Sequence, residues 1–309
     1  MISYYFKSLR SKTMRQVDEY RSGAWVLVER PTTEEIAELS RRFSLDLGNL
    51  EDAVDEDEMP RLVRDGGLSY VYTRHVLKSG ENDPSTSPAL FIVGPDLFVT
   101  ISLRPLPNLN KFLTNTIDVA TTQRTKLLLL LVQELVDEYD VSINRLSRKI
   151  QRIRNRLRYH RVESDDFIDF VVVEDELNEY LSALQPLSTI LRRLATGKYL
   201  ALFEEDKDLV EDLLLDNEQS IEACKSTTKT IVNIREAYST IASNELNRTM
   251  KILTIATVII ALPNVFFGMY GMNVDLPFDD NPYSYFFVVG MTSVVMLVTI
   301  LVARRKHIF

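Results

Sequence analysis

The residues with the clearest capacity for chemistry lie near the C-terminal end, in a stretch without charged side chains. There, small and polar residues recur at alternating intervals of three and four, which is the spacing of one helix face. They are Thr254, Thr257, Ala261, Asn264 and Gly268. Two interpretations stay open: packing between membrane helices, the commoner reason for such a stripe, and the lining of a pore. An amide at membrane depth, as at Asn264, needs a partner or water, which adds weight to the pore.

Two uncharged stretches must position this stripe. Residues 252–274 and 283–303 are each about as long as the roughly 20 residues that a bilayer core requires, so we expect two membrane-spanning helices. The loop between them carries Asp275, Asp279 and Asp280. The outer flanks carry Arg248, Lys251, Arg304, Arg305 and Lys306. This asymmetry predicts that both termini are cytoplasmic and that the acidic loop is outside.

The stripe continues on the cytoplasmic side of the first span, where Met250 and Asn247 follow at the same spacing. A flexible apolar side chain and an amide would therefore face the same axis. One chain with two spans cannot enclose a pore, so a pore would require a homo-oligomer with the first span innermost. The second span is richer in large apolar residues, as expected of an outer, lipid-facing helix.

Composition limits the alternatives. The chain has 309 residues and a net charge of -8, from 44 acidic and 36 basic residues, which argues against a dedicated nucleic-acid binder. Its single cysteine, Cys224, excludes an intramolecular disulfide and is expected to pack between helices. The N-terminus has no basic segment followed by an apolar one, so we expect no cleavable signal peptide.

One run of basic residues is expected to form a solvated or acid-paired helix face. It comprises Arg145, Arg148, Lys149, Arg152, Arg154, Arg156, Arg158 and Arg161.

Residues 1–120 are predicted to form a mixed α/β domain. Apolar runs bounded by turn residues predict strands, the last two of them a hairpin. The runs are residues 24–28, 68–76, 89–93 and 97–101. Thr32 and Glu35 have the spacing of a capping box, which predicts an amphipathic helix starting there.

Residues 121–251 are predicted to be long helices that end in a stalk. Residues 108–185 contain neither Gly nor Pro and carry a broken helical stripe. A second helix should begin after residues 163–166 and end near Gly197. Residues 198–262 again lack Gly and Pro, and an unbroken helix there would be roughly 100 Å long and would enter the bilayer. Few apolar residues occur in 216–229, which predicts a partly polar, water-facing stalk.

Tyr270-Gly271-Met272-Asn273, directly after the first of two C-terminal spans and before a short loop, resembles the signature of the CorA family of magnesium transporters. A basic C-terminal tail accompanies it, and in this context the short motif is specific. The similarity extends over the whole chain. Further segments that resemble the family's N-terminal domain are Ala24-Trp25, Pro31-Thr32, Leu50-Glu51-Asp52-Ala53 and Pro60-Arg61.

The resemblance implies an architecture: an α/β cytoplasmic domain of residues 1–120, long cytoplasmic helices and stalk to residue 251, and two C-terminal transmembrane helices, assembled as a funnel-shaped pentameric channel. The pore-lining span would be 252–273, the outside loop 274–282, the second span 283–303 and the basic cytoplasmic tail 304–309.

The resemblance also implies roles for residues. Gly271, Met272 and Asn273 would form the selectivity filter, in which the Asn273 side chain and the Gly271 carbonyl hold a hydrated cation. Asn247 and Met250 match the polar and hydrophobic constrictions below the membrane, and a ring of methionines could gate by dewetting. Asn264 departs from the family, where threonine is frequent after the proline.

Gating in the family is attributed to cytoplasmic Mg²⁺ bound between subunits. Asp212, with Asp216 one turn later, is the best match for the stalk carboxylates, and Glu81 or Asp83 is a poorer match for their partner. An acidic pair at this spacing is also common on an ordinary solvated helix face. The acids of the loop, likewise, could concentrate cations or be ordinary loop acids.

The implied function is influx of Mg²⁺, with Co²⁺ or Ni²⁺ as further cargo, driven by the membrane potential. Moving two charges through 100 mV provides about 4.6 kcal/mol, so no ATP site is required, and the sequence contains no P-loop. We expect no enzyme and no cofactor, with Mg²⁺ as transported and regulatory ion. Expected partners are further copies of the chain, membrane lipid and divalent cations. The alternatives are a Zn²⁺ transporter of the same superfamily and a membrane-anchored coiled-coil scaffold or sensor.

Overall fold

The structure, a computed structural model, describes residues 1–77, 86–156, 164–272 and 283–305. The chain forms two compact units, Met1–Val232 and Asn233–Phe309. Helix α6 (Glu204–Tyr270) begins in the first unit and ends in the second. The first unit is an α/β domain with three long helices, and the second contains the end of α6 and helix α7 (Ser284–Arg305).

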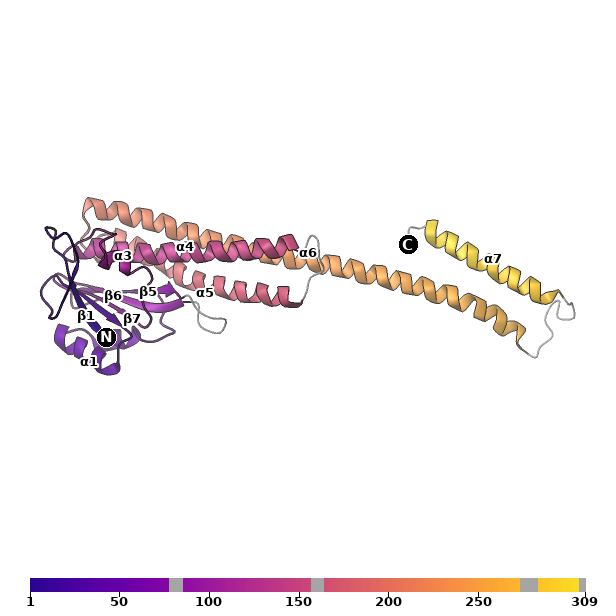
Figure 1. Cartoon of the computed structure of the whole chain (residues 1–309), viewed down its shortest axis with the longest axis horizontal. Helices are drawn as coiled ribbons and strands as arrows, with labels where there is room; N and C mark the ends of the chain where they lie inside the picture. Colours follow the sequence, from indigo (N-terminus) through magenta and orange to yellow (C-terminus); the bar gives the residue numbers. More distant parts are fainter. Residues whose placement is uncertain (78–85, 157–163, 273–282, 306–309) are drawn as a thin grey trace. The chain divides into compact units, whose positions relative to one another are not determined.

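A mixed sheet lies at the centre of the first unit (Figure 1). In the described part of the chain its strand order is β2-β1-β3-β7-β6-β5-β4, and neighbours are antiparallel except for the parallel pair β3 and β7. The strands are β1 Ile2–Phe6, β2 Arg15–Val17, β3 Trp25–Glu29, β4 Leu62–Asp65, β5 Leu68–Val76, β6 Thr86–Val93 and β7 Phe98–Ser102. The predicted strands are confirmed as β3, β5, β6 and β7, and the predicted hairpin as the β6–β7 pair.

Three strands, β1, β2 and β4, were not predicted from the sequence. For β4 a signal was present: Gly66 and Gly67 connect it to β5, and Asp65 pairs with Leu68. Both glycines have positive φ, 55° and 82°. A two-residue hairpin loop of this kind needs positive φ at both positions, which glycine adopts without strain.

Helices α1 (Thr33–Phe43) and α2 (Leu47–Asp52) cover one face of the sheet, and Figure 1 shows α1 on the opposite side from α4. The predicted capping box is confirmed. The Glu35 backbone N–H donates to Thr32 Oγ1 at 3.2 Å, and the Thr32 N–H donates to Glu35 Oε2 at 3.0 Å. This backbone hydrogen bond lowers the pKa of the Glu35 carboxyl. The cap fixes where α1 begins, so that Ile36 and Leu39 are buried against the sheet.

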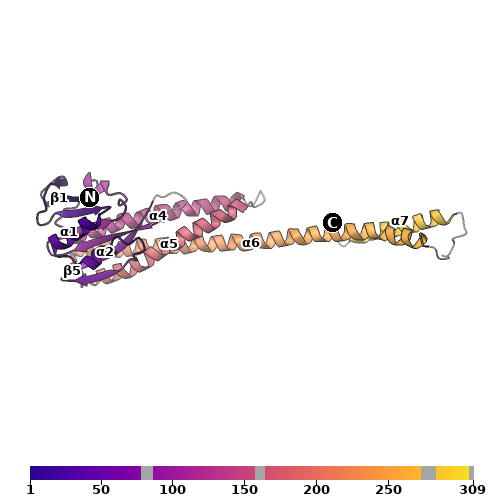
Figure 2. The same cartoon turned by 90° about the horizontal axis from the view of Figure 1, so that it is seen from below.

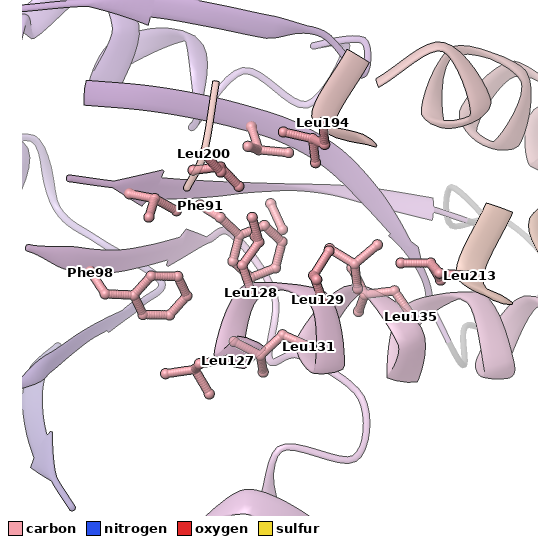
Figure 3. Packing of buried hydrophobic residues seen from close by; sticks show 14 of the residues in the cluster. Phe91, Phe98, Leu127, Leu128, Leu129, Leu131, Leu135, Leu194, Leu200 and Leu213 are labelled. Atoms are coloured by element: carbon pink, nitrogen blue, oxygen red, sulfur yellow. The ribbon is translucent and has the colours of Figure 1, made fainter. Parts of the chain in front are cut away.

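The other face packs against α4 (Arg124–Arg156) together with α5 (Ser164–Ala195) and the start of α6, and the short helix α3 (Asn110–Leu113) precedes them. Figure 3 shows this core, in which leucines of α4 lie among side chains of the sheet and of the later helices. The labelled residues are Phe91, Phe98, Leu127, Leu128, Leu129, Leu131, Leu135, Leu194, Leu200 and Leu213. The leucine-rich start of α4 therefore attaches the long helices to the sheet.

The long helices are confirmed, and their direction follows from contacts between them. Lys126 of α4 pairs with Glu205 at 3.1 Å, and Gln133 donates to Asp216 at 3.0 Å, so α4 and α6 run parallel. α5 runs in the opposite direction, since Arg145 of α4 pairs with Glu176 and Lys149 pairs with Asp169 (Figure 2). α6 has 67 residues and continues through Pro263. At 1.5 Å per residue it is about 100 Å long, as expected.

The stalk differs from its prediction in one respect. Within the first unit, one face of α6 is buried at alternating intervals of four and three residues, which is the spacing of a packing seam. Its members include Val210, Leu213, Asn217, Ser220, Cys224, Thr227 and Ile231. Asn217 Nδ2 donates to the Leu184 carbonyl at 3.0 Å and to Ser188 Oγ at 2.7 Å, both on α5. The stalk is partly polar, as predicted, but the expectation that it faces water is wrong for this face.

One buried histidine in β5 makes the stability of the first unit depend on pH. His75 is 0% exposed, and burial lowers its pKa to about 4. In the described part of the chain its Nε2 has no hydrogen-bond partner. The unfolded chain binds a proton below a pKa of about 6.5, whereas the folded chain stays neutral until about pH 4, so stability is lost as the pH falls through this window.

We expect the free energy of unfolding to fall by about 2 kcal/mol between pH 7 and pH 5 because of this group. Chemical denaturation of the protein at several pH values, followed by circular dichroism, measures the fall. In His75→Leu, the fall in the free energy of unfolding between pH 7 and pH 5 should be smaller by about 2 kcal/mol, since leucine cannot bind a proton. An unchanged slope in the variant would assign the acid sensitivity to other groups.

Candidate functional site

Both expected spans are helical and mostly unburied. An 18-residue apolar stretch within Glu204–Met269 of α6 has 0% of its residues buried, and the corresponding stretch within Tyr285–Ala303 of α7 has 17% buried. A core helix of a soluble protein with this composition would be mostly buried. The exposure of these helices therefore fits a lipid environment or a further subunit.

The polar stripe lies on α6 as one continuous helix face. Every member of the stripe is exposed: Asn247, Met250, Thr254, Thr257, Ala261, Asn264 and Gly268. A different face is half-buried and carries Ile255, Ile259, Leu262 and Phe266. On α7, Val288 and Thr292 are buried. These four apolar side chains are thus partly covered, whereas the stripe and other apolar residues of the span, such as Ile260 and Phe267, are exposed.

The threonine hydroxyls of the stripe have their protons engaged within the helix. Thr254 Oγ1 donates to the Met250 carbonyl at 2.8 Å, and Thr257 Oγ1 donates to the Leu253 carbonyl at 2.9 Å. Each hydroxyl oxygen therefore presents lone pairs outward. A hydrated cation, whose water molecules point their hydrogens outward, is the kind of species that such acceptor oxygens can contact.

The helix ends where the tripeptide begins. α6 closes at Tyr270, and the Gly271 N–H donates back to the Phe267 carbonyl at 3.0 Å. A Cβ on Gly271 would lie 3.3 Å from that same carbonyl oxygen, so the tight turn favours glycine. Met272 follows in the turn and is 61% exposed. Asn273, like Asp275, Asp279 and Asp280 of the loop, lies outside the described residues.

The two stalk carboxylates differ in their surroundings. Asp212 is exposed, whereas Asp216 is half-buried and accepts a hydrogen bond from Gln133 Nε2 at 3.0 Å. The candidate partners Glu81 and Asp83 lie outside the described residues. Among the residues that the structure covers, no group of three His, Cys, Asp or Glu side chains could hold a metal ion.

Asp216 also lines a cleft between α4 and α6 that the sequence did not indicate. The cleft has a volume of about 500 Å³, and its acidic side chains include Asp137 and Asp140 of α4. Gln133 donates to Asp137 at 2.9 Å as well as to Asp216, which holds these two carboxylates beside one amide. The spacing of Gln133 and Asp137 was visible in the sequence, but nothing there places α4 beside α6.

Two features of the sequence have structural explanations. Cys224 is fully buried, and burial raises the pKa of its thiol to about 12, so it is a packing residue as expected. The basic run of α4 is partly paired with acids of α5, through Arg145–Glu176 at 3.2 Å and Lys149–Asp169 at 2.7 Å. Both pairs agree with an acid-paired helix face.

Comparisons with known proteins match the chain over nearly its full length. Residues 21–305 match the model of a family described as CorA-like Mg²⁺ transporter protein. A cobalt/magnesium transport protein CorA of Methanocaldococcus jannaschii is 24% identical over 298 residues, covering 94% of this chain and 92% of that protein.

Solved structures give the same picture of the fold. The complete CorA magnesium transporter structure from the same organism superposes with a TM-score of 0.86 at 22% identity, covering 99% of this chain and 98% of that one. The cytoplasmic domain of ZntB from Vibrio parahaemolyticus is more distant, with a TM-score of 0.63 at 8% identity over 78% of this chain and 98% of that one.

Proposed function

The chain belongs to the family of CorA-like Mg²⁺ transporter proteins, and from this premise we propose that it conducts hydrated divalent cations, with Mg²⁺ as the main cargo and Co²⁺ or Ni²⁺ as further cargo. Members of this family are transporters and not enzymes. The observation that carries the proposal is α6, one unbroken helix whose exposed polar stripe ends directly before Gly271-Met272-Asn273. The name of the Methanocaldococcus relative, which includes cobalt and magnesium, supports this choice of cargo.

The proposed filter holds the cation by its water. Mg²⁺ prefers octahedral oxygen coordination and gives up water reluctantly, so a ring of neutral oxygens can accept hydrogen bonds from the hydration shell without replacing it. We assign this role to the Asn273 side chain and the Gly271 carbonyl, with Met272 between them. Neutral oxygens bind weakly enough for release, and the loop acids Asp275, Asp279 and Asp280 raise the local cation concentration.

Below the filter, the stripe becomes the pore wall. Thr254, Thr257, Ala261, Asn264 and Gly268 then face the lumen, and Met250 and Asn247 form its cytoplasmic end. A ring of Met250 side chains closes the pore by excluding water. One copy of α6 cannot surround a pore, so the active form is a homo-oligomer, which we propose to be a pentamer with α7 outside and facing lipid.

The proposed orientation in the cell membrane places both termini in the cytoplasm, because basic residues flank the outer ends of both spans and are missing from the loop between them. The membrane potential then drives cations inward. Two charges moving through 100 mV provide about 4.6 kcal/mol, which is enough for uptake without ATP.

Flux measurements with purified protein in liposomes test the transport proposal. Mg²⁺, Co²⁺, Ni²⁺ and Zn²⁺ compete for uptake under an imposed potential, with and without a proton gradient. We expect potential-driven Mg²⁺ uptake that needs no proton gradient. Preferred Zn²⁺ uptake coupled to protons would select the zinc alternative, and the absence of any flux would select the anchored scaffold.

We further propose that cytoplasmic Mg²⁺ closes the pore by binding at Asp212, with Asp216 assisting. The exposure of Asp212 leaves its carboxylate accessible to a neighbouring subunit or ion. Mg²⁺ should protect the cytoplasmic domain of the wild-type protein against proteolysis, because a bound cation stabilises the state that holds it.

The variant Asp212→Ala should require about a tenfold higher Mg²⁺ concentration for the same protection, since it lacks one charged ligand. Limited proteolysis across a Mg²⁺ series measures this shift. Glu222→Ala, another acidic residue on an exposed part of α6, is the matched control and should behave as wild type. Equal protection in wild type and Asp212→Ala would remove Asp212 from the sensor.

A further inference from the structure

A second cavity, separate from the stalk cleft and the stripe, lies in the first unit where three segments of the chain meet. It has a volume of about 450 Å³, within the range of small-molecule sites. Its walls come from the β4–β5 and β6–β7 turns, from the start of α4 and from the connection between α5 and α6. The lining includes Arg64, Gly94, Pro95, Arg124, Lys126, Tyr199 and Phe203.

The charged side chains of this lining are mostly basic. In the described part of the chain, Arg124 has no ion-pair partner, and Arg64 donates to a backbone carbonyl, that of Lys198, and has no carboxylate partner. Lys126 pairs with Glu205 at 3.1 Å, but Glu205 is 81% exposed, so solvent screens this pair. One acid, Asp206, also lines the cavity; its Oδ2 accepts a hydrogen bond from the Phe203 backbone N–H at 3.0 Å, and among the described residues neither arginine forms an ion pair with it. Basic side chains therefore outnumber acids in this cavity, and the arginine guanidinium is well suited to bind phosphate groups.

The backbone at the start of α4 also favours a negatively charged ligand. Arg124 and Lys126 occupy the first turn of α4, which carries no acidic residue. In the covered residues, the backbone N–H groups of residues 124–126 donate no backbone hydrogen bond, as is usual in the first turn of a helix. Positively charged side chains in the first turn are repelled by the positive end of the helix dipole. A bound anion there would be attracted both by these side chains and by the backbone N–H groups.

Another part of the wall is apolar and includes aromatic rings. Phe203 is 77% exposed although it lines the cavity, and Tyr199 lies on the same segment. Leu200, Val93 and Pro95 complete this side. A flat aromatic surface beside a phosphate-binding group fits a base attached to a phosphate chain better than it fits free phosphate.

We propose that this cavity binds a nucleoside phosphate, whose phosphates contact Arg64, Arg124 and the first turn of α4 and whose base packs on Phe203. The site joins the starts of α4 and α6. The ligand would therefore hold together the two parallel helices at the end of the cytoplasmic domain where both begin.

Isothermal titration calorimetry of the full chain in detergent tests the site, in Mg²⁺-free buffer so that the result is independent of transport. The probes are ADP, tripolyphosphate and adenosine. We expect ADP to bind, tripolyphosphate to bind more weakly, and adenosine not to bind. Arg124→Gln and Arg64→Gln should each raise the Kd for ADP about tenfold, because each removes a charge-assisted contact. Arg192→Gln, which changes an exposed arginine on α5 outside the cavity, should leave it unchanged.

Phe203→Ala separates the two parts of the proposal. It should weaken ADP binding and leave tripolyphosphate binding unchanged, since only the nucleoside needs the ring. Unchanged ADP binding in this variant would refute the proposed contact between the base and Phe203, and the cavity would then bind phosphate groups alone. No binding of ADP or tripolyphosphate to the wild-type protein, or binding that survives both arginine substitutions, would overturn the site itself.

Discussion

Replacing Asn273 by alanine should abolish selective Mg²⁺ uptake, with at least about a tenfold fall in the initial rate. The variant removes from every subunit the amide that we assign to the hydrated cation, so the loss is repeated around the ring. Without those acceptors, the hydration shell has no preferred partner at the pore mouth. The measurement is uptake into liposomes that contain a Mg²⁺-sensitive dye, under a potassium diffusion potential of fixed size.

Asn281→Ala is the matched control, because it removes the same amide from the same loop but outside the tripeptide. Its uptake should equal that of the wild type. Normal Mg²⁺ selectivity and rate in Asn273→Ala would refute the filter assignment. A loss of flux in both variants would point to a general requirement of the loop.

A cysteine at position 257 should make transport sensitive to a cationic thiol reagent. In the proposed pore, Thr257→Cys exposes its thiol to water in the lumen, and attachment of a bulky cation there should reduce uptake by about tenfold or more, since it adds both volume and like charge. The background is favourable, because the single native cysteine, Cys224, is fully buried and burial raises its thiol pKa to about 12. The measurement is uptake before and after treatment.

Val258→Cys is the matched control for this experiment. It lies one residue further along α6 and therefore on another face of the helix, which we assign to lipid or a neighbouring helix. A thiol there meets little water, so the reagent should leave transport unchanged. Equal inhibition of the two variants would mean that accessibility does not follow the stripe, and an insensitive Thr257→Cys would place the lumen elsewhere.

Much of the local structure was predictable because the signals act over short distances. The capping box at Thr32 and Glu35 defines the start of α1 by two hydrogen bonds within four residues. The absence of Gly and Pro from residues 198–262 allowed the long helix, and Gly197, with φ of 71°, lies just beyond the end of α5 as predicted. The short strands β1 and β2 were missed because pairing with neighbours determines them more than their own composition does, whereas the Gly66–Gly67 loop was an overlooked signal for β4.

The surroundings of the stalk were not predictable in the same way. Residues 216–229 carry few apolar side chains, and the sequence therefore favoured water, yet Asn217 and Thr227 are buried. The amide nitrogen of Asn217 is satisfied in this buried position because the Leu184 carbonyl and the Ser188 hydroxyl of α5 accept hydrogen bonds from it. Hydrogen-bond partners more than twenty residues away in the chain cannot be recognised from a local pattern.

The sequence by itself determined the two spans, the tripeptide after the first of them, and the polar stripe on one helix face, because hydrophobic length and helical spacing are local properties. Only the tertiary structure decided which sides of those helices are covered. In the folded protein, Gln133 donates hydrogen bonds to both Asp216 and Asp137. Arg64, Arg124 and Phe203 line one cavity. These residues come from segments far apart in the chain, and their proximity depends on the packing of α4, α5 and α6 against the sheet, which no single segment encodes.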